Sequence, residues 1–501
     1  MPKTAITGSL VSIGVDKEGK TPVYQQIARG LTHAIETGKL AAGSKLPSTR
    51  VFAEELGVSR NTVLKVFEGL TDAGLLVGRV GAGTFVRELV DPFAEGMPVV
   101  EVTPERHASP LRSLSRRGKA LVASATGEFS ERPTPFMPDL PDLREFPIRS
   151  WLRLLNETSG RLTGQILGET SNAGYEPLRR AIAQHLSAAR GILCDYSQVV
   201  ITTGSQQGLD LVCRMLLDAG DPVWVEDPGY IGTRSIIRAN GGIVCPVPVD
   251  ADGFRIDDAV DQLPVPRLVC VSPSRQYPLG AQLAASRRMA LLDVAERSGA
   301  FVVEDDYDSE FLYDGNAIPA ICGSDRAART IYMGTFSKVL LPSFRLGYLV
   351  VPADFREAFA SARAVVDRHA SLIEQMVLSE FMDRGLFASH IRRMRALYQA
   401  RRNQLLSGIE ALFGGGCRAA TPNSGTHLLL PLRAGCDDVS VARRAAERGL
   451  VLRPLSPYFM TDRARPGLLF GFSSFNEAEI SRGLDLLSSF RTEIDAEPAE
   501  W

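Results

Sequence analysis

The stretch YMGTFSKVLLPSFRLGY, residues 332–348, decides how the rest of the chain is interpreted. Within it Lys338 follows Thr335 and Ser337, and Arg345 comes seven positions after the lysine. Most lysines are solvated surface groups, so Lys338 indicates a function only if other segments supply partners for it. Three other segments of the sequence supply such partners.

A carboxylate and a phenol lie in VVEDDYDSEF, residues 302–311, at the end of an apolar, strand-like run. Asp305 comes 33 residues before Lys338, and Tyr307 follows it closely. A lysine that forms a Schiff base, a carboxylate that keeps a pyridine nitrogen protonated and a phenol near the ring oxygen suit pyridoxal 5′-phosphate. The combination predicts a pyridoxal phosphate site with Lys338 as its reactive residue.

A cradle for the cofactor's phosphate is predicted in TTGSQQGLDL, residues 202–211. There Gly204, Ser205 and Gln206 open a helix directly after a strand, where backbone N–H groups and the positive end of the helix favour a dianion. Arg345 can add a bidentate clamp. The expected cofactor contacts also include the hydroxyl residues Thr335 and Ser337.

Tyr230 ends the segment VEDPGY, residues 225–230, which follows the next predicted strand. In that position the tyrosine is expected to stack on the cofactor ring. A tyrosine buried in the core is the alternative interpretation.

The fold class follows from apolar runs that alternate with helical segments from about Trp151 onward. Strands this hydrophobic, spaced by helices, predict an α/β fold with a mostly parallel sheet covered on both faces. From about Ile391 we expect a long helix, three further strands (GTHLLLPL, GLVLRPL and GLLFGFS) and a closing helix, which together make a smaller α+β subdomain. The runs in the larger part are VVITTG, PVWVEDP, GGIVCPVPVD, RLVCVSP, AFVVEDD, TIYMGTF and LGYLVVP.

The N-terminal region predicts three short helices and a glycine-rich hairpin. Apolar residues recur every four positions in the first helix, at Val23, Ile27, Leu31 and Ile35, before a stop at Gly38. Two further helices begin at the caps Ser48 and Ser59, the first of them ending near Gly57. Their spacing is that of a helix-turn-helix, and LLVGRVGAGTFV predicts a two-stranded wing. The expected inner contacts are Val51, Leu56, Val58 and Val63.

Composition bounds the remaining possibilities. With 501 residues, 45% hydrophobic and 23% charged, the chain is expected to form two or three soluble globular units. Its start, MPKTAITGSLVSIGV, lacks a secretory signal, and no apolar run approaches the ~18 residues of a membrane span, so we expect a cytoplasmic protein. The scattered cysteines predict neither a disulfide framework nor a metal site. They are Cys194, Cys213, Cys245, Cys270, Cys322, Cys417 and Cys436.

Charge separates the N-terminal region from the rest of a chain whose net charge is -2. Residues 20–87 carry nine basic and five acidic side chains, a local surplus of positive charge. Such a surplus favours contact with nucleic-acid phosphates. The proline-rich stretch that follows, with the basic run RHASPLRSLSRRGK at residues 106–119, is typical of a linker.

The N-terminal region resembles the winged helix-turn-helix of the GntR superfamily of bacterial regulators, through PVYQQIARGLTHAIETGKLAAGSKLPSTRVFAEELGVSRNTVLKVFEGLTDAGLL and GRVGAGTFV. The resemblance places Ser59, Arg60, Asn61 and Thr62 at the start of a recognition helix in the DNA major groove. Arg50, Arg60 and Arg79 are the expected arginine contacts to DNA. A solvated surface arginine is the alternative for each of the three.

The rest of the chain resembles fold-type I aminotransferases, from about Thr126 to Phe490. The motifs EDDYDSEF, GTFSKVLLPSFRLGY, EDPGY and PSRQYPLG behind a GntR-type winged helix are similar to those of the MocR family. That resemblance implies a homodimer in which Lys338 forms the aldimine, Asp305 pairs with the pyridinium, Tyr307 lies near O3′ and Arg345 binds the phosphate.

Two departures from the family pattern concern the ligand side of the site. The family usually has PSHQ where this chain has Arg275 in PSRQ, so the histidine's role is lost or taken over by Arg275. Fold-type I aminotransferases commonly bind the substrate carboxylate through an arginine in the strand near GFS, where this chain has Leu469. Arg453 and Arg465 are the possible substitutes, with a surface role open for Arg465.

Three functions remain open. The first is a DNA-binding transcription regulator that senses a small amino compound through aldimine formation at Lys338. The second is an active aminotransferase with a DNA-binding appendage, and the third is a regulator that senses pyridoxal phosphate itself. The intact DNA motif and the uncertain carboxylate arginine favour the first. The expected domains are residues 20–87 for DNA binding, 88–147 as linker and 148–495 for the cofactor and effector.

Overall fold

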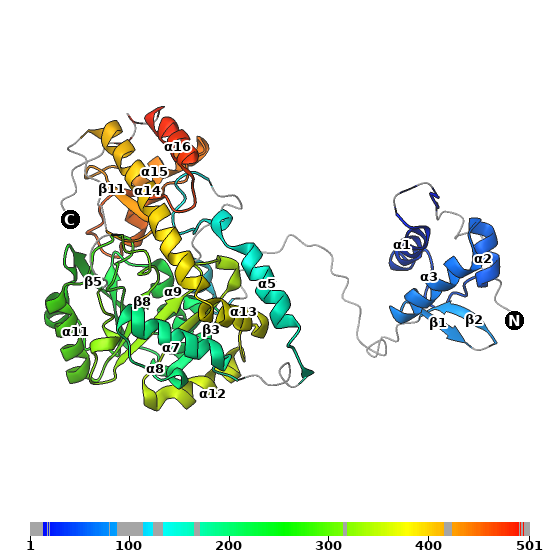
Figure 1. The fold of residues 1–501 in the computed structure, drawn as a ribbon, viewed down its shortest axis with the longest axis horizontal. Coiled ribbons are helices and arrows are strands. Elements are labelled where there is room, and N and C mark those ends of the chain that lie inside the picture. Colours follow the sequence, from blue (N-terminus) through cyan, green and yellow to red (C-terminus); the bar gives the residue numbers. More distant parts are fainter. Residues whose placement is uncertain are drawn as a thin grey trace. The chain divides into compact units, whose positions relative to one another are not determined.

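The computed structural model in Figure 1 divides the chain into two compact units, Met1–Ala108 and Ser109–Trp501. The structure describes residues 14–17, 19, 21–79, 81–87, 114–123, 134–164, 171–313, 318–414, 423–489, 491 and 494. The basic run at residues 106–119 lies outside these ranges in its first eight residues. In the described ranges, none of the helices combines the length and the apolar character that a membrane crossing requires.

The first unit is a winged helix-turn-helix, as predicted. It consists of α1 (Val23–Glu36), α2 (Thr49–Leu56), α3 (Arg60–Asp72) and the antiparallel wing of β1 (Leu76–Arg79) and β2 (Gly83–Val86). The side chains of Ser48 and Ser59 accept hydrogen bonds from the backbone N–H of Val51 (3.3 Å) and Thr62 (3.1 Å). Both predicted N-caps are therefore confirmed, and Gly57 ends α2 in the left-handed conformation, at φ 61°.

One predicted inner contact of this unit is wrong. Val51 is 43% exposed, whereas Phe52 and Ala53 are buried. Because α2 begins at Thr49, the helical period turns residues 52, 53 and 56 toward α3, and Val51 falls on the outer face. Val63 is buried as predicted, and Leu56 and Val58 pack against the same core.

The second unit contains an eight-stranded sheet in the order β3-β10-β9-β8-β7-β4-β5-β6. The neighbouring strands between β9 and β5 run parallel, while β10 is antiparallel to both β3 and β9. All seven predicted runs form strands, and only the short β6 was not predicted. The strands are β3 (Val199–Thr202), β4 (Pro222–Asp227), β5 (Ile243–Asp250), β6 (Gly253–Phe254), β7 (Leu268–Val271), β8 (Phe301–Asp306), β9 (Thr330–Thr335) and β10 (Gly347–Val350).

Helices cover both faces of this sheet, as its apolar strands require. On one face α8 (Ser205–Leu216), α9 (Ile231–Ala239) and α12 (Arg356–Val366) share a core with alternate strand residues such as Val200 and Leu349. The intervening residues, such as Ile201 and Val302, face the helices of the other side. These helices are α5 (Ile148–Ser159), α7 (Glu176–Arg190), α10 (Ile256–Gln262), α11 (Ala285–Ser298) and α13 (Leu372–Asp383).

A smaller α+β subdomain follows, as predicted. Its antiparallel sheet has the order β11-β13-β12, with β11 (His427–Pro431), β12 (Arg453–Pro454) and β13 (Gly467–Gly471). The long yellow helix in Figure 1 is α14 (Leu386–Phe413), which begins five residues before the predicted start and packs against α16 (Glu477–Ser489). Between β11 and β12 lies α15 (Asp438–Glu447).

Residues 134–146, here named the strap, pack on this subdomain, although the sequence analysis assigned residues 88–147 to a linker. The backbone N–H of Gly471 donates to the carbonyl of Phe136 (2.7 Å), and that of Val451 donates to Pro135 (3.1 Å). Phe136 and Met137 are buried. Earlier in the same range, α4 (Arg116–Ala123) packs against α9 within the second unit. Proline-rich composition thus concealed two segments that contact the second unit.

Candidate cofactor, ligand and DNA sites

Lys338 lies directly after β9, in the turn that leads toward β10. Its side chain is partly buried, and Nζ donates a hydrogen bond to the carbonyl oxygen of Asp139 (3.0 Å) in the strap. The same Nζ is 3.9 Å from Oδ1 of Asp139. The predicted reactive lysine therefore points into the interior of the unit, where a carboxylate faces it.

Asp305 is near the end of β8, the neighbour of β9, and pairs with Met333 across the sheet. Burial, together with the nearby Asp306 and Asp308, raises the pKa of its carboxyl from 3.8 to about 7, and Lys338 only partly offsets this. A cationic ring N–H would relieve the cost of ionising this carboxyl. The carboxylate of Asp305 therefore suits the protonated ring nitrogen of a pyridoxal cofactor.

Tyr307 contacts Arg275, the residue that stands where the family usually has a histidine. Nη1 of Arg275 donates to the hydroxyl of Tyr307 (3.2 Å) and forms an ion pair with Asp308 (3.1 Å). Both members of the ion pair are only 2% exposed. Gly425 covers the guanidinium so closely that an added Cβ would lie 2.2 Å from Cζ of Arg275. Arg275 thus orients the phenol and balances a buried acid.

The segment predicted to hold the cofactor's phosphate begins α8, and Arg345 lies beside it. Gly204 caps α8 at φ 105°, a conformation that favours glycine, and Ser205 and Gln206 begin the helix. A Cβ added to Gly204 would lie 3.6 Å from Cζ of Arg345, so the guanidinium lies beside the helix start. Free N–H groups and a guanidinium side by side suit a dianion.

The hydroxyl residues around Lys338 have separate roles. Thr335 is buried, and its Oγ1 accepts a hydrogen bond from the backbone N–H of Ser337 (3.2 Å), which shapes the turn before the lysine. Ser337 is half-buried beside Lys338.

Tyr230 is not a core tyrosine, because its side chain is 41% exposed. Its hydroxyl accepts a hydrogen bond from Nε2 of Gln206 (2.7 Å), which ties it to the phosphate cradle. The ring also meets that of Tyr277 edge-on, with centroids 6.0 Å apart. Tyr230 and Asp305 line one pocket, whose other residues are Val225, Glu226, Gly229, Thr233, Arg234, Cys270, Val271, Ser272 and Met460. Of the predicted cofactor residues, Tyr230 and Asp305 therefore share this hollow, and Gln206 is tied to it through the hydroxyl of Tyr230.

Of the two arginines suggested for a ligand carboxylate, only Arg453 is placed among these residues. It lies on β12 opposite the buried Leu469, donates to the carboxylate of Asp139 and is 3.3 Å from the hydroxyl of Tyr277. Arg465 is exposed in the segment that precedes β13. Arg465 therefore lies at the surface, the alternative that the sequence left open for it.

Sequence reasoning missed Asp139 and Tyr277. The hydroxyl of Tyr277 donates to Oδ2 of Asp139 (2.9 Å) and lies 3.1 Å from the hydroxyl of Tyr458. Tyr277 belongs to the motif PSRQYPLG, which the sequence analysis quoted for the family resemblance without assigning the tyrosine to the site. Asp139 had no signal, because it lies in the stretch interpreted as a linker.

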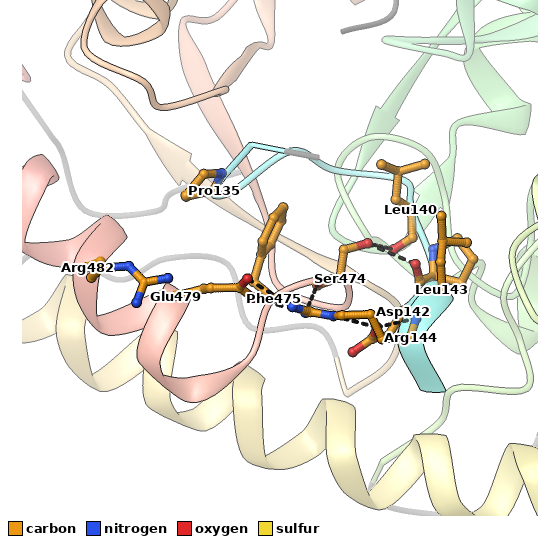
Figure 2. Close-up of a pocket in the computed structure, with 10 residues that line it drawn as sticks. Pro135, Leu140, Asp142, Leu143, Arg144, Ser474, Phe475, Glu479 and Arg482 are labelled. Carbon is orange, nitrogen blue, oxygen red and sulfur yellow. Dashed lines mark hydrogen bonds and ion pairs between the residues drawn. The ribbon is translucent and has the colours of Figure 1, made fainter. Parts of the chain in front are cut away.

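A second hollow, shown in Figure 2, lies apart from the predicted cofactor residues, between the strap and α16. There Arg144 donates to both carboxylate oxygens of Glu479 (2.9 Å each) and to the carbonyl of Ser474 (2.7 Å). These bonds tie the end of the strap to the subdomain. The hollow therefore lies at the contact between the end of the strap and the subdomain.

In the first unit, the predicted DNA contacts fall into two groups. Arg60 and Asn61 are exposed at the start of α3. Ser59 and Thr62 are bonded to each other through their hydroxyls (2.8 Å), so they hold the helix start in shape.

The other two predicted DNA contacts, Arg50 and Arg79, are exposed and have partners of their own. Arg50 pairs with Glu54 (3.3 Å), and Cζ of Arg79 lies 4.9 Å from the centre of the Phe85 ring in the wing. Neither contact removes the guanidinium from solvent.

Comparison with protein families separates the same two parts of the chain. Residues 23–86 match the model "Bacterial regulatory proteins, gntR family". Residues 139–468 match the model "Aminotransferase class I and II". The second match begins at Asp139 in the strap and ends within β13.

Curated relatives and a solved structure agree with both matches. The chain is 34% identical to the probable rhizopine catabolism regulatory protein MocR of Rhizobium meliloti, over 95% of each chain. It is 30% identical to the pyridoxine biosynthesis transcriptional regulator PdxR of Corynebacterium glutamicum, over 95% of this chain and 98% of that one. The kynurenine aminotransferase of Pyrococcus horikoshii matches with TM-score 0.66 and 27% identity, over 78% of this chain and 96% of that one.

Proposed function

Because the chain belongs to the MocR family of GntR-type transcription regulators with an aminotransferase-like domain, we propose that it binds pyridoxal phosphate at Lys338 and senses a small amino compound there. The observation that carries this proposal is that Lys338 lies near enough to Asp305 to lower its pKa, while Arg345 lies beside Gly204 at the start of α8, in a chain with an intact winged helix. When bound, the cofactor supplies a carbonyl carbon that can exchange one amine for another.

The residues of the site have distinct tasks in this proposal. Lys338 holds the cofactor and is displaced by the ligand's amine. Asp305 pairs with the ring nitrogen, Arg275 orients the phenol of Tyr307 next to the ring, and the start of α8 holds the phosphate with Arg345. Tyr230, whose hydroxyl accepts a hydrogen bond from Gln206, would contact the cofactor ring.

Residues 20–87 bind the operator in this proposal, with Arg60 and Asn61 on α3 and Arg79 on the wing as contacts. Residues 88–147 join them to the cofactor domain, 148–495, and the last part of this connection is the strap. We also propose that the protein is a cytoplasmic homodimer, because a two-fold protein suits paired half-sites on DNA. Light scattering should then give twice the chain mass of 54.4 kDa.

Two alternatives compete with this function. An aminotransferase must hold an amino acid and then a keto acid in one orientation, which requires a free cation for the carboxylate. Here Arg453 is already paired with Asp139, which favours the regulator. A relative named for pyridoxine biosynthesis supports the other alternative, in which the cofactor itself is the signal.

The test uses the purified protein and an operator fragment selected by that protein from random-sequence DNA. Lys338→Ala should lose the visible absorption of the lysine-bound cofactor while keeping its fold and its DNA binding in the absence of ligand. In wild type, an amine that shifts the absorption should also change operator affinity.

The outcomes separate the alternatives. A persistent shift that changes operator affinity supports sensing of an amine. Conversion to the pyridoxamine form that a keto acid reverses identifies an aminotransferase. Operator affinity that depends on the cofactor alone identifies the cofactor as the signal.

A further inference from the structure

Asp139 stands in an unusual backbone conformation at the edge of the ligand site. Its φ is 70°, in the left-handed region that residues other than glycine seldom adopt. Aspartate tolerates this region better than most residues, but such a conformation persists only when surrounding contacts determine it.

Three side chains converge on this residue from different parts of the fold. Arg453 donates to its carboxylate from β12, and Tyr277 donates to Oδ2 (2.9 Å) from the segment after β7. Lys338 approaches from the end of β9, 3.0 Å from the carbonyl oxygen. The carboxylate thus occupies the space between the reactive lysine and the nearest arginine.

The strap is fixed on both sides of Asp139. Phe136 is buried, with its carbonyl bonded to Gly471, and on the other side Asp142 accepts from Arg401 (2.8 Å). Arg144 adds its two bonds to Glu479, as Figure 2 shows. Asp139 is therefore held in place before a ligand arrives and does not need to move into the site.

At this end of the site the carboxylate of Asp139 stands between two cations, Lys338 and Arg453. Burial by itself would raise the pKa of Asp139, but Lys338 and Arg453 outweigh it, so the pKa is held well below its ordinary value and the side chain is a carboxylate at neutral pH. A ligand carboxylate at this place would meet Asp139, and Leu469 opposite Arg453 offers it no cation. A ligand with a second ammonium group would be repelled by the guanidinium of Arg453.

We propose that Asp139 is a specificity-determining residue that makes the site select a primary amine bearing hydroxyl groups and no carboxylate. This inference rests on the proposed function, since the amine is the group that exchanges at Lys338. The carboxylate of Asp139 accepts a hydrogen bond from a ligand hydroxyl, and the guanidinium of Arg453, which carries five N–H groups, donates to the oxygen of that hydroxyl. A neutral hydroxyl satisfies both kinds of partner without adding charge.

Matched ligand pairs test the preference in the cofactor-loaded protein. Serinol differs from L-serine, and 3-amino-1-propanol from β-alanine, only in carrying a hydroxymethyl group in place of the carboxylate. Wild type should bind the alcohol of each pair at least about tenfold more tightly, measured by calorimetry and by the shift in cofactor absorption. Asp139→Gly, which keeps the φ of 70° without strain and frees Arg453, should reverse this order.

A probe without an amine makes the test independent of exchange at Lys338. Propionate should raise the unfolding temperature of Asp139→Gly but not that of wild type, while 1-propanol should affect neither. Asp139→Asn keeps the side-chain size and should respond to propionate in between. Asp293→Asn, on the exposed face of α11, is the matched control and should behave as wild type.

The outcomes distinguish this inference from the proposed function. Wild type that prefers L-serine and β-alanine, or is stabilised by propionate as strongly as Asp139→Gly, overturns the role of Asp139 and leaves the regulator intact. Cofactor absorption that is the same in wild type and Lys338→Ala overturns the proposed function, and the propionate result still decides what Asp139 excludes.

Discussion

At the scale of single residues, the second unit keeps several acids in surroundings that suit a cationic partner. Asp308 is buried and the nearby Asp305 is half-buried, and desolvation raises the pKa of Asp308 to about 6 and that of Asp305 to about 7. Asp308 has its partner within the chain, in Arg275. The charge of Lys338 only partly offsets the raised pKa of Asp305. The carboxylate of Asp305 would therefore be the one to pair with a cationic cofactor.

Asp305→Asn should have opposite effects on the protein without and with its cofactor. A carboxyl whose pKa rises from 3.8 to about 7 on folding opposes folding once it ionises, so the cost is absent below about pH 4 and complete above about pH 7. Without cofactor, the variant should therefore be more stable than wild type by up to about 4 kcal/mol at pH 8 and equal to it at pH 4. With cofactor it should be the less stable protein. Thermal unfolding at both pH values measures this, and a variant less stable at pH 8 without cofactor contradicts it.

Arg275→Met should destabilise the protein because it leaves Asp308 buried without its cation. Breaking a buried pair in this way costs about 3 kcal/mol. Since Asp308 must then be protonated, the loss should be larger at pH 8 than at pH 5. Arg297→Met, which breaks an exposed pair with Asp293, should change stability by no more than about 0.5 kcal/mol. Equal losses in the two variants, measured by urea unfolding, would refute this account.

At the scale of elements, helix starts carry both halves of the function. The start of α8 has Gly204 as its cap and no side-chain cap hydrogen bond. The start of α3 is closed by the hydroxyl of Ser59, and Thr62 completes the contact. In the proposed function, the uncapped start of α8 would receive a phosphate, and the capped start of α3 would hold Arg60 and Asn61 for DNA.

Ser59→Ala should loosen the start of α3 by about 1 kcal/mol, because the backbone N–H of Thr62 loses its side-chain acceptor and keeps only the carbonyl of Ser59. Hydrogen–deuterium exchange at residues 60–63 should become faster, and operator affinity should fall while cofactor absorption is unchanged. Ser48→Ala, which removes the cap of α2, is the matched control: it should speed exchange at residues 49–52 only. If hydrogen–deuterium exchange at residues 60–63 is unchanged in Ser59→Ala, the cap does not stabilise the start of α3.

At the scale of the whole molecule, the strap joins residues that are far apart along the chain. Asp142 pairs with Arg401 on α14, and Arg144 pairs with Glu479 on α16. The first pair is buried, with exposures of 2% and 4%, whereas Arg144 is 50% exposed. Because Asp139 lies between these bonds and the buried Phe136, the strap fixes Asp139 relative to the subdomain.

The two attachments should differ in strength. Asp142→Asn leaves Arg401 buried without a carboxylate and should cost about 3 kcal/mol, whereas Arg144→Gln should cost about 1 kcal/mol. Both variants should weaken binding of the alcohol ligands, since Asp139 is then less firmly placed. Urea unfolding and calorimetry measure the two effects. A larger loss of stability in Arg144→Gln than in Asp142→Asn would contradict the role given to burial.

The sequence by itself determined the elements and the motifs that are local. Ser48, Ser59 and Gly57 specify helix ends through bonds to their own neighbours, and the seven apolar runs became strands because a sheet covered on both faces requires them. Lys338, Asp305 and the cradle at Gly204 could be predicted because each stands at the end of a strand. Strand ends of a parallel sheet meet at one edge.

Only the tertiary structure decided what depends on distant residues. Val51 faces outward because the start of α2 sets its helical phase. Arg275 meets Asp308 and Tyr307, and Asp139 reaches Arg453, 314 positions away, through contacts that no local pattern encodes. The strap looked like a linker because its proline-rich composition carries no periodicity, and its burial follows from a subdomain formed by the last part of the chain.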